Sequence, residues 1–194
     1  MRAAVALGCD YVELDVQRTP AGRLVVAHDA PDEESGWSLD EVLEAVGPTA
    51  GVHLDLKIDE GEVEAVAHVV AAVGAGRVVV TTAVDASIAR LRAWRDAHAP
   101  ELLLGLSTAY SGTGLGRRMV GWWPRARMRR ARPDVVVSQH VLARWWLRRW
   151  ARQHGFLLLV WTVDDDADLR YWLRPGCCWM LTTNEPTRAL TLRP

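Results

Sequence analysis

Apolar and polar residues alternate in several short stretches of this 194-residue sequence. In residues 11–17 the apolar side chains of Val12, Leu14 and Val16 occupy every second position. Such alternation predicts a β-strand with one apolar face. Further strand-like runs begin 22 to 41 residues apart, so that the expected strands are 11–17, 52–58, 77–82, 102–106, 134–138, 156–163 and 178–182. The run "AGRLVV", residues 21–26, predicts a turn and a short strand that pairs back on the first.

Helix signals fill the segments between these strands. Ser38 and Glu41 form a capping box, Trp37 and Val42 are placed for a hydrophobic staple, and Gly47-Pro48 ends the helix. Four further helices are expected: a valine stripe from Val63 to Val73 closed by Gly74, a helix capped by Asp85, one marked by Leu142, Trp146 and Trp150 and stopped by Gly155, and one capped by Asp165 or Asp166.

Strands and helices that alternate at this spacing indicate an α/β fold. Seven main strands are one fewer than in a (β/α)8 TIM barrel, so we expect such a barrel lacking its first strand, as a single domain over residues 1–194. A doubly wound sheet is the alternative. Those sheets usually bury both strand faces with apolar residues, whereas two of the strands expected here carry charges on one face.

The charged faces belong to the strands at 11–17 and 52–58. Glu13 and Asp15 share one face of the first strand, about 7 Å apart. His53, Asp55 and Lys57 share one face of the second. If the two are neighbouring barrel strands, their charged faces line the interior mouth of the barrel while the apolar faces pack under the helices.

Three carboxylates gathered in one place require a compensating cation, because buried unpaired charges are costly. Oxygen ligands from Glu13, Asp15 and Asp55 suit a hard divalent ion, Mg²⁺ or Ca²⁺. Lys57 beside the ion would help to hold a phosphate, and His28, at the end of the short strand, could move a proton. The alternatives remain an exposed strand face, a surface histidine and an ordinary salt bridge of Lys57.

Composition excludes few classes of protein. The net charge of −1 gives no overall attraction for polyanions, and no apolar run reaches the ~18 residues that span a membrane. The N-terminus lacks the apolar core of a signal peptide, and the three cysteines form no C-x-x-C pair. We therefore expect a cytoplasmic protein with reduced thiols. Lys57 is the one lysine among 23 basic residues.

The motifs resemble those of the glycerophosphodiester phosphodiesterase family of TIM barrels. The run "GCDYVELDVQRTPAGRLVVAHD", residues 8–29, is similar to the family's G-A-D-x-[IV]-E-x-D-V-x-x-T-x-D-G-x-x-V-V-x-H-D. Shorter similarities follow in the family's order: "LDLK" resembles E-x-K, "LLLVWTVDD" resembles V-x-x-W-T-V-N, and "LTTNEP" resembles T-[DN]-x-P. The resemblance spans most of the chain.

This resemblance implies metal-dependent hydrolysis of glycerophosphodiesters to sn-glycerol 3-phosphate and an alcohol, within lipid and glycerol metabolism. Each motif position then carries a role: Glu13, Asp15 and Asp55 are metal ligands, His28 is a catalytic histidine, Lys57 lies on the phosphate side, and Trp161 faces the glycerol moiety. The implied partner is a small-molecule glycerophosphodiester and the implied cofactor a divalent metal ion.

The sequence departs from the family pattern in several places. The opening H-R-G and P-E-N-T motifs are not found, so we expect that an N-terminal βα unit with a second catalytic histidine is missing. Asp55 stands where the family usually has Glu, and His53 or His140 could replace the missing histidine. Two other functions stay open: an inactive relative that still binds metal or phosphate, and a related phospholipase-type phosphodiesterase.

A basic, tryptophan-rich segment, "GRRMVGWWPRARMRRARP" at residues 116–133, stands apart from these motifs. A solvated, arginine-rich loop and helix is the simplest interpretation. Peripheral contact with an anionic membrane surface is a second. Nucleic acid binding is a third, and we expect no nucleic-acid partner. The oligomeric state is left undetermined.

Overall fold

The structure is a computed structural model that describes residues 2–34, 36–58, 60–108 and 124–194. Its backbone contacts divide the chain into two compact units, Met1–Leu104 and Gly105–Pro194. Strands and helices alternate in both units, which confirms the predicted α/β class. The expectation of a single domain over 1–194 stays a prediction.

The first unit contains five strands in the order β3-β2-β1-β4-β5. The parallel strands β1 (Tyr11–Arg18), β4 (Gly51–Leu56) and β5 (Val78–Thr82) lie at its centre. The short strands β2 (Leu24–Val26) and β3 (Trp37–Ser38) extend the sheet in antiparallel pairing, so the predicted return strand is confirmed. The division between the units falls within β6 (Leu103–Ser107).

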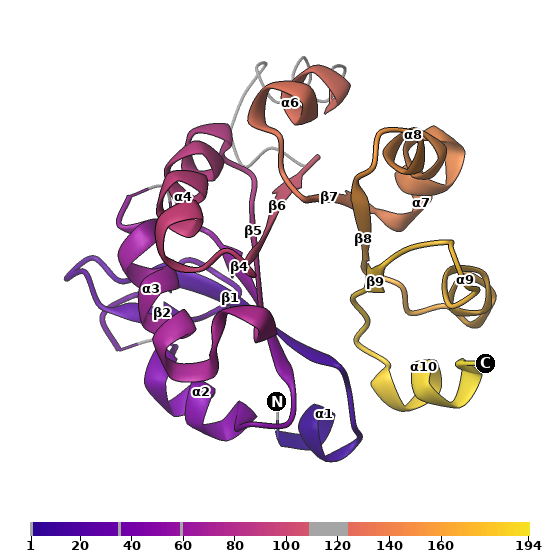
Figure 1. The fold of residues 1–194 in the computed structure, drawn as a ribbon. Coiled ribbons are helices and arrows are strands. Elements are labelled where there is room, and N and C mark those ends of the chain that lie inside the picture. The colour runs from indigo at the N-terminus through magenta and orange to yellow at the C-terminus, as the bar shows by residue number, and fades with distance from the viewer. Residues whose placement is uncertain (1, 35, 59, 109–123) are drawn as a thin grey trace. The chain divides into compact units, whose positions relative to one another are not determined.

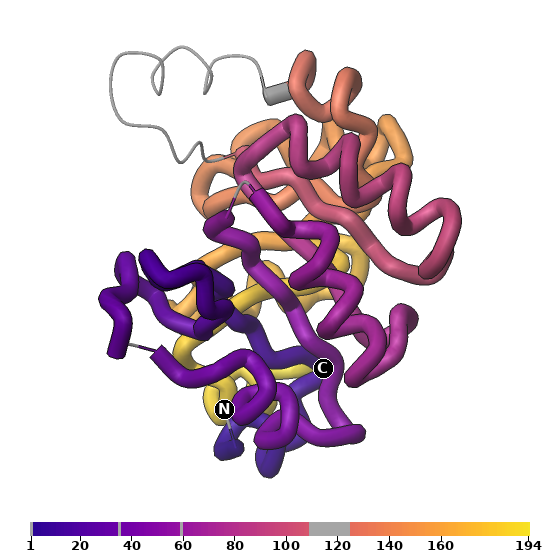
Figure 2. The backbone as a smooth tube through the Cα atoms, turned by 90° about the vertical axis from the view of Figure 1, so that its left-hand side faces the viewer, coloured from indigo at the N-terminus to yellow at the C-terminus, as the bar shows by residue number. Residues whose placement is uncertain are grey.

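Helices cover one side of the sheet in the first unit. They are α2 (Leu39–Val46), α3 (Glu62–Val73) and α4 (Asp85–His98), with the short α1 (Arg2–Ala6) before β1 and a 3-10 turn at Ala75–Arg77. α3 packs on β4 and β5, and α4 packs on β5 (Figure 1). Figure 2 views the unit from the side on which these helices lie. The core forms between them and the sheet, where Leu14, Val16 and Leu54 are almost fully buried.

Most of the predicted helix boundaries are confirmed. The capping box at Ser38 is complete, because the Ser38 side chain accepts from the Glu41 N–H and the Glu41 side chain accepts from the Ser38 N–H. Gly47, at φ 64°, ends α2, and Gly74 ends α3. The prediction that Asp85 caps a helix is wrong: Val84 is the N-cap and Asp85 is the first helical residue. There its carboxylate still lies at the positive end of the helix dipole.

The second unit has parallel strands β7 (Val135–Gln139), β8 (Leu157–Trp161) and β9 (Met180–Leu181), with β7 paired to the end of β6. The helices are α6 (Pro124–Ala131), α9 (Asp166–Trp172), α10 (Pro186–Leu192) and a continuous helical segment, residues 140–153. That segment consists of α7 (His140–Leu142), a π-helical part (Ala143–Leu147) and α8 (Arg148–Gln153). Asp165 caps α9 as predicted, by accepting from the Ala167 N–H at 2.8 Å.

The predicted apolar stripe of segment 140–153 is only partly correct. Trp150 is buried, but Leu142 is 41% exposed, and the inward side instead consists of Ala143, Leu147, Trp150 and Ala151. The π-helical part explains the difference. Its i→i+5 hydrogen bonds, such as that from the Arg148 N–H to the Ala143 carbonyl, take more residues per turn than the 3.6 on which the prediction rested.

The basic segment 116–133 is described only in part. Residues 116–123, including Trp122 and Trp123, lie outside the described residues, and the remainder forms α6 and the two residues after it. Within the described ranges, no helix has both the length and the apolar character needed to cross a membrane.

Candidate metal and phosphate site

The acidic residues of β1 and β4 meet because the two strands are parallel neighbours. Their register pairs Asp15 with Asp55 and Glu13 with His53. One carboxylate oxygen from each of Glu13, Asp15 and Asp55 lies within 4.8 Å of the other two. We call these three residues the acidic cluster. The structure therefore brings together all three predicted metal ligands.

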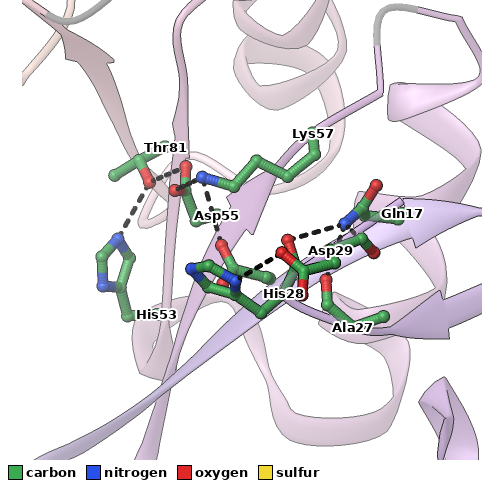
Figure 3. A network of polar contacts seen from close by, with 9 residues as sticks. Gln17, Ala27, His28, Asp29, His53, Asp55, Lys57 and Thr81 are labelled. Atoms are coloured by element: carbon green, nitrogen blue, oxygen red, sulfur yellow. Dashed lines mark hydrogen bonds and ion pairs between the residues drawn. The ribbon is translucent and has the colours of Figure 1, made fainter. Parts of the chain in front are cut away.

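Lys57 follows β4 directly and bridges the two aspartates. The Lys57 N–H donates to the Val16 carbonyl at 2.9 Å, which continues the pairing of the two strands. Its Nζ lies 3.1 Å from Asp15 Oδ1 and 2.6 Å from Asp55 Oδ2 (Figure 3). Desolvation lowers the pKa of Lys57, but the charges and hydrogen bonds of Asp55 and Asp15 outweigh it, so the pKa is raised overall. Lys57 therefore stays charged at neutral pH.

Glu13 shows that one lysine does not neutralise the cluster. Desolvation, followed by repulsion from Asp15 and Asp55, raises the pKa of Glu13 to about 7 against the smaller opposite effects of Lys57 and His28. Glu13 is nevertheless the most solvent-exposed of the three acids, so an ion can reach it. An all-oxygen donor set with excess negative charge fits a hard divalent cation such as Mg²⁺ or Ca²⁺.

Thr81, on the adjacent strand β5, holds Asp55 and also contacts His53 of β4. The Thr81 hydroxyl donates to Asp55 Oδ1 at 2.8 Å, and Thr81 Oγ1 lies 2.9 Å from His53 Nε2. Because the one hydroxyl proton goes to Asp55, Thr81 must accept from His53, which fixes the proton of the neutral imidazole on Nε2. His53 Nδ1 is then a buried acceptor, and no described residue donates to it.

His53 is thus a support for Asp55. It is buried, and desolvation lowers its pKa to about 4 although the charge of Asp55 opposes the shift. It lies level with Glu13 in the register, two residues before Asp55 along β4. A buried neutral histidine that already donates to Thr81 is poorly placed to exchange protons with a substrate.

His28 lies on the loop directly after β2, beside the acidic cluster. The Ala27 N–H donates to the Asp15 carbonyl at 3.0 Å, which ties this loop to β1. Gln17 Nε2 donates to the carbonyls of Ala27, His28 and Asp29 (Figure 3). The His28 side chain is 88% exposed and its Nδ1 lies 3.0 Å from Asp29 Oδ1. The loop is therefore fixed by its backbone while the imidazole stays open to solvent.

Trp161 and the two later motifs belong to the second unit. Trp161 ends β8 and is half-buried. Asp164, in the same motif, connects it to the closing motif "LTTNEP". Its carboxylate accepts hydrogen bonds from Thr183 Oγ1 at 3.0 Å, from the Asn184 N–H at 2.8 Å and from Asn184 Nδ2 at 3.0 Å. Desolvation opposes these bonds, but they outweigh it and lower the pKa of Asp164. His140, the other candidate histidine, lies 3.6 Å from Asp168.

Sequence reasoning missed Thr81, Gln17 and Asp164. Thr81 gave no signal of its own, because a threonine in a valine-rich strand is ordinary. Gln17 continues the polar face of β1 and is part of the longest motif, so alternation could have indicated it. Asp164 directly follows the "LLLVWTV" run, where a second acid, Asp165, drew attention as the helix cap.

A scan against protein-family models matches residues 1–60 to the glycerophosphoryl diester phosphodiesterase family. That range contains the acidic cluster, Lys57 and His28. The N-terminal part of the chain is therefore similar in sequence to this family. The resemblance inferred from the motifs is thereby confirmed for this part of the chain. Among curated proteins, none matches this sequence.

Solved structures resemble the chain over almost its whole length. A glycerophosphodiester phosphodiesterase from Thermotoga maritima has 18% sequence identity and a TM-score of 0.69, over 99% of this chain and 89% of that one. One from Parabacteroides distasonis has 15% identity and a TM-score of 0.70, over 98% and 86%. An Oleispira antarctica phosphodiesterase, in complex with the product sn-glycerol-3-phosphate, has 14% identity and a TM-score of 0.69, over 98% and 87%. At these identities the likeness shows the fold, in agreement with the TIM-barrel expectation.

Proposed function

We propose that this chain is a metal-dependent phosphodiester hydrolase, which cleaves glycerophosphodiesters to sn-glycerol 3-phosphate and an alcohol. One observation carries the proposal: Glu13, Asp15, Asp55 and Lys57 meet on two adjacent parallel strands and the residue after the second. The matched family and the glycerophosphodiester phosphodiesterases that share the fold support it.

The acidic cluster would hold the ion through one or more oxygens of each carboxylate. A bound divalent ion supplies positive charge that stabilises the phosphodiester as negative charge builds up on it. Asp55 is one methylene shorter than the usual Glu, and the hydrogen bond from Thr81 fixes one of its oxygens. The other oxygen and the Asp15 carboxylate are held by Lys57. These contacts keep the cluster in place before an ion arrives.

Lys57 would also orient the phosphate. Its charge is secured by the two aspartates, and its side chain remains 42% exposed. A substrate phosphate approaching the cluster therefore meets a cation that needs little reorganisation, which favours the more negatively charged transition state.

His28 would transfer a proton. Its exposed imidazole is paired with Asp29, and the backbone of its loop is tied to Gln17 and Asp15. We assign it one of two steps, removal of a proton from the attacking hydroxyl or donation of a proton to the leaving alcohol. From its motif position, Trp161 is assigned the contact with the glycerol moiety.

A coupled glycerol 3-phosphate assay tests this function, with Mg²⁺, Ca²⁺ or EDTA present. We expect ion-dependent turnover that falls about 100-fold or more in His28→Asn, which removes a general acid–base. His68→Asn is the matched control, because His68 also forms a histidine–aspartate pair, with Asp40, but lies on α3. Turnover that is unaffected by EDTA, or equal loss in both variants, would contradict the mechanism.

An inactive, ion-binding relative is the second candidate. It is favoured by Lys57, which already compensates two of the acids. Isothermal titration with Ca²⁺ or Mg²⁺ separates the two candidates. Ion binding that Glu13→Gln weakens, without turnover of any glycerophosphodiester, would support this relative and exclude the hydrolase.

A further inference from the structure

Arginine is concentrated in one stretch of the chain. Residues 102–163 contain eleven arginines and no lysine, and Asp134 is the one acidic residue among them. The whole chain has a net charge of −1, so this strongly positive stretch is offset by acidic residues elsewhere. Segment 140–153 lies within it and contains four arginines and no carboxylate.

Near its N-terminal end, segment 140–153 exposes apolar residues on its outward side. Its inward side packs into the second unit through Ala143, Leu147, Trp150 and Ala151. A helix on the surface of a folded core is normally polar on the opposite side. Here Val141 is 51% exposed, Leu142 is 41% exposed and Trp145 is 83% exposed. An indole so fully in water, beside two aliphatic side chains, is not explained by the packing of its own unit.

The same segment also carries arginines, in addition to the exposed Val141, Leu142 and Trp145. Arg144 is half-exposed, stacks over Tyr171 at 4.2 Å and lies 3.0 Å from Asp168 Oδ1. Arg149 and Arg152, in α8, are exposed. An open hollow of about 510 Å³ lies beside Trp145, lined also by His140, Val141, Arg144 and Asp168.

Together, these features match what an anionic lipid surface requires. Tryptophan is enriched where hydrocarbon meets water, since its ring is apolar and its N–H can still be hydrated. Arginine binds phosphate-bearing headgroups while its alkyl stem lies on apolar surface. A second copy of this chain would bring the same arginines against one another, and single-stranded nucleic acid would leave Val141 and Leu142 without a role.

We propose that segment 140–153 docks this chain on an anionic membrane surface, with Val141, Leu142 and Trp145 inserted at the headgroup level and Arg149 and Arg152 on the lipid phosphates. The proposal goes beyond hydrolysis and does not depend on it, because it uses none of the residues assigned to the metal and phosphate site.

Vesicle flotation of the full chain tests the proposal. The vesicles contain phosphatidylcholine alone, or phosphatidylcholine with about one third phosphatidylserine, a strongly anionic mixture. We expect binding to the anionic vesicles at about 0.1 M salt and its loss at about 1 M, where the Debye length falls to about 3 Å. Equal binding to the neutral vesicles, or binding that salt does not weaken, would overturn the proposal.

Matched variants locate the surface. Trp145→Ala should weaken binding about tenfold or more, because it removes the most exposed ring of the cluster. Trp37→Ala is its control and should bind like the wild type, since Trp37 is 66% exposed in the first unit and lies within four residues of Glu33, Glu34 and Asp40 in the sequence. The double variant Arg149→Gln/Arg152→Gln should weaken binding about tenfold or more, as each arginine near an anionic surface contributes about fivefold.

The charge control is the double variant Arg170→Gln/Arg188→Gln, which lowers the net charge equally. Arg170 and Arg188 both lie near Asp166, outside segment 140–153. Unfolding midpoints are compared for all variants, so that lost binding is not mistaken for lost folding. Three results would each overturn the proposal: equal losses in test and control variants, tighter binding to single-stranded RNA in a gel shift, or a wild-type dimer that Trp145→Ala converts to a monomer.

Discussion

At the scale of single residues, the acidic cluster depends on the side chains that hold its carboxylates in place. Thr81 of β5 donates to Asp55 and accepts from His53, so β4 and β5 are joined side chain to side chain. Lys57 then connects β4 to β1, because its Nζ contacts both Asp55 and Asp15. Asp55 thereby has both of its oxygens engaged, which fixes its orientation although it is shorter than the glutamate usual at this motif position.

Thr81→Val should therefore loosen the cluster. The variant leaves an oxygen of Asp55 and the buried His53 Nε2 without their partner, which costs about 1–3 kcal/mol of unfolding free energy. Ion affinity should fall about 10–100-fold, as is usual when the support of a metal ligand is lost. Urea unfolding and calorimetric titration with Ca²⁺ measure the two effects.

Thr82→Val is the control for that experiment. Thr82 is the next residue of β5, equally buried, and its hydroxyl accepts a 3.2 Å hydrogen bond from the Val84 N–H. We expect a small loss of stability and unchanged ion affinity. If both variants lost affinity alike, Thr81 would have no special role in placing Asp55.

The pH dependence of stability should show that His53 is buried in the neutral form. Burial lowers its folded-state pKa from 6.5 to about 4, so the unfolded state binds the proton first. The contribution of His53 is therefore present above pH 6.5 and is lost as the pH falls from about 6.5 to 4. Glu13 acts in the opposite direction, since its folded pKa of about 7 lies above 4.5.

Variants separate the contribution of His53 to this pH dependence from that of Glu13. His53→Leu should have a flatter fall in unfolding free energy between pH 6.5 and about 4 than the wild type, whatever its stability at pH 7. Chemical unfolding at several pH values provides the measurement, and an unchanged slope in His53→Leu would show that His53 is protonated or accessible in the folded state.

At the scale of elements, local sequence signals set the start of α2 more firmly than those of the other helices. The complete capping box of Ser38 and Glu41 satisfies two N–H groups that the helix itself leaves free. α3 and α4 begin without a side-chain cap, so their ends depend on packing against β4 and β5. This difference explains why α2 was predicted to the residue while the start of α4 was not.

Ser38→Ala should lower stability by about 1 kcal/mol, the usual contribution of an N-cap. For a chain of this size the melting temperature should fall by about 2–4 °C. Ser38→Thr keeps the hydroxyl and should melt close to the wild type. Thermal unfolding followed by circular dichroism compares the three proteins, and equal melting of the alanine and wild-type proteins would mean that α2 does not depend on its cap.

At the scale of the whole molecule, the charge left over in the acidic cluster should make stability depend on divalent ions. An ion at about a hundred times its dissociation constant stabilises the folded state by about 2.7 kcal/mol, so the melting temperature should rise by roughly 5–10 °C. Glu13→Gln and Asp55→Asn should reduce the rise. A rise that persists in both variants would place the ion elsewhere.

Unfolding should also decide the domain organisation. The sequence predicts one domain over 1–194, whereas the backbone contacts form two compact units that divide after Leu104. We predict a single calorimetric transition for the full chain, as one cooperative domain shows. Two separate transitions would show that the units unfold independently.

The sequence by itself determined the local features of this protein. Alternation with period two located the strands and showed that Glu13 and Asp15 share a face, and that Asp55 and Lys57 share another, because side chains in a strand alternate whatever the strand pairs with. Motif order then added the family resemblance and the roles it implies. The capping box and the glycines placed several helix ends, since these depend on hydrogen bonds between residues close together in the chain.

Only the tertiary structure decided which residues meet. The register of β1 against β4 sets Asp15 level with Asp55, and β5 brings Thr81 to the same place, although these residues are 26 to 66 positions apart in the chain. Likewise, the π-helical bonds in segment 140–153 turned Leu142 outward against the 3.6-residue pattern. Hydrogen bonds between distant strands and the packing of a whole helix depend on residues far apart in the chain, so a local pattern of apolar residues does not encode them.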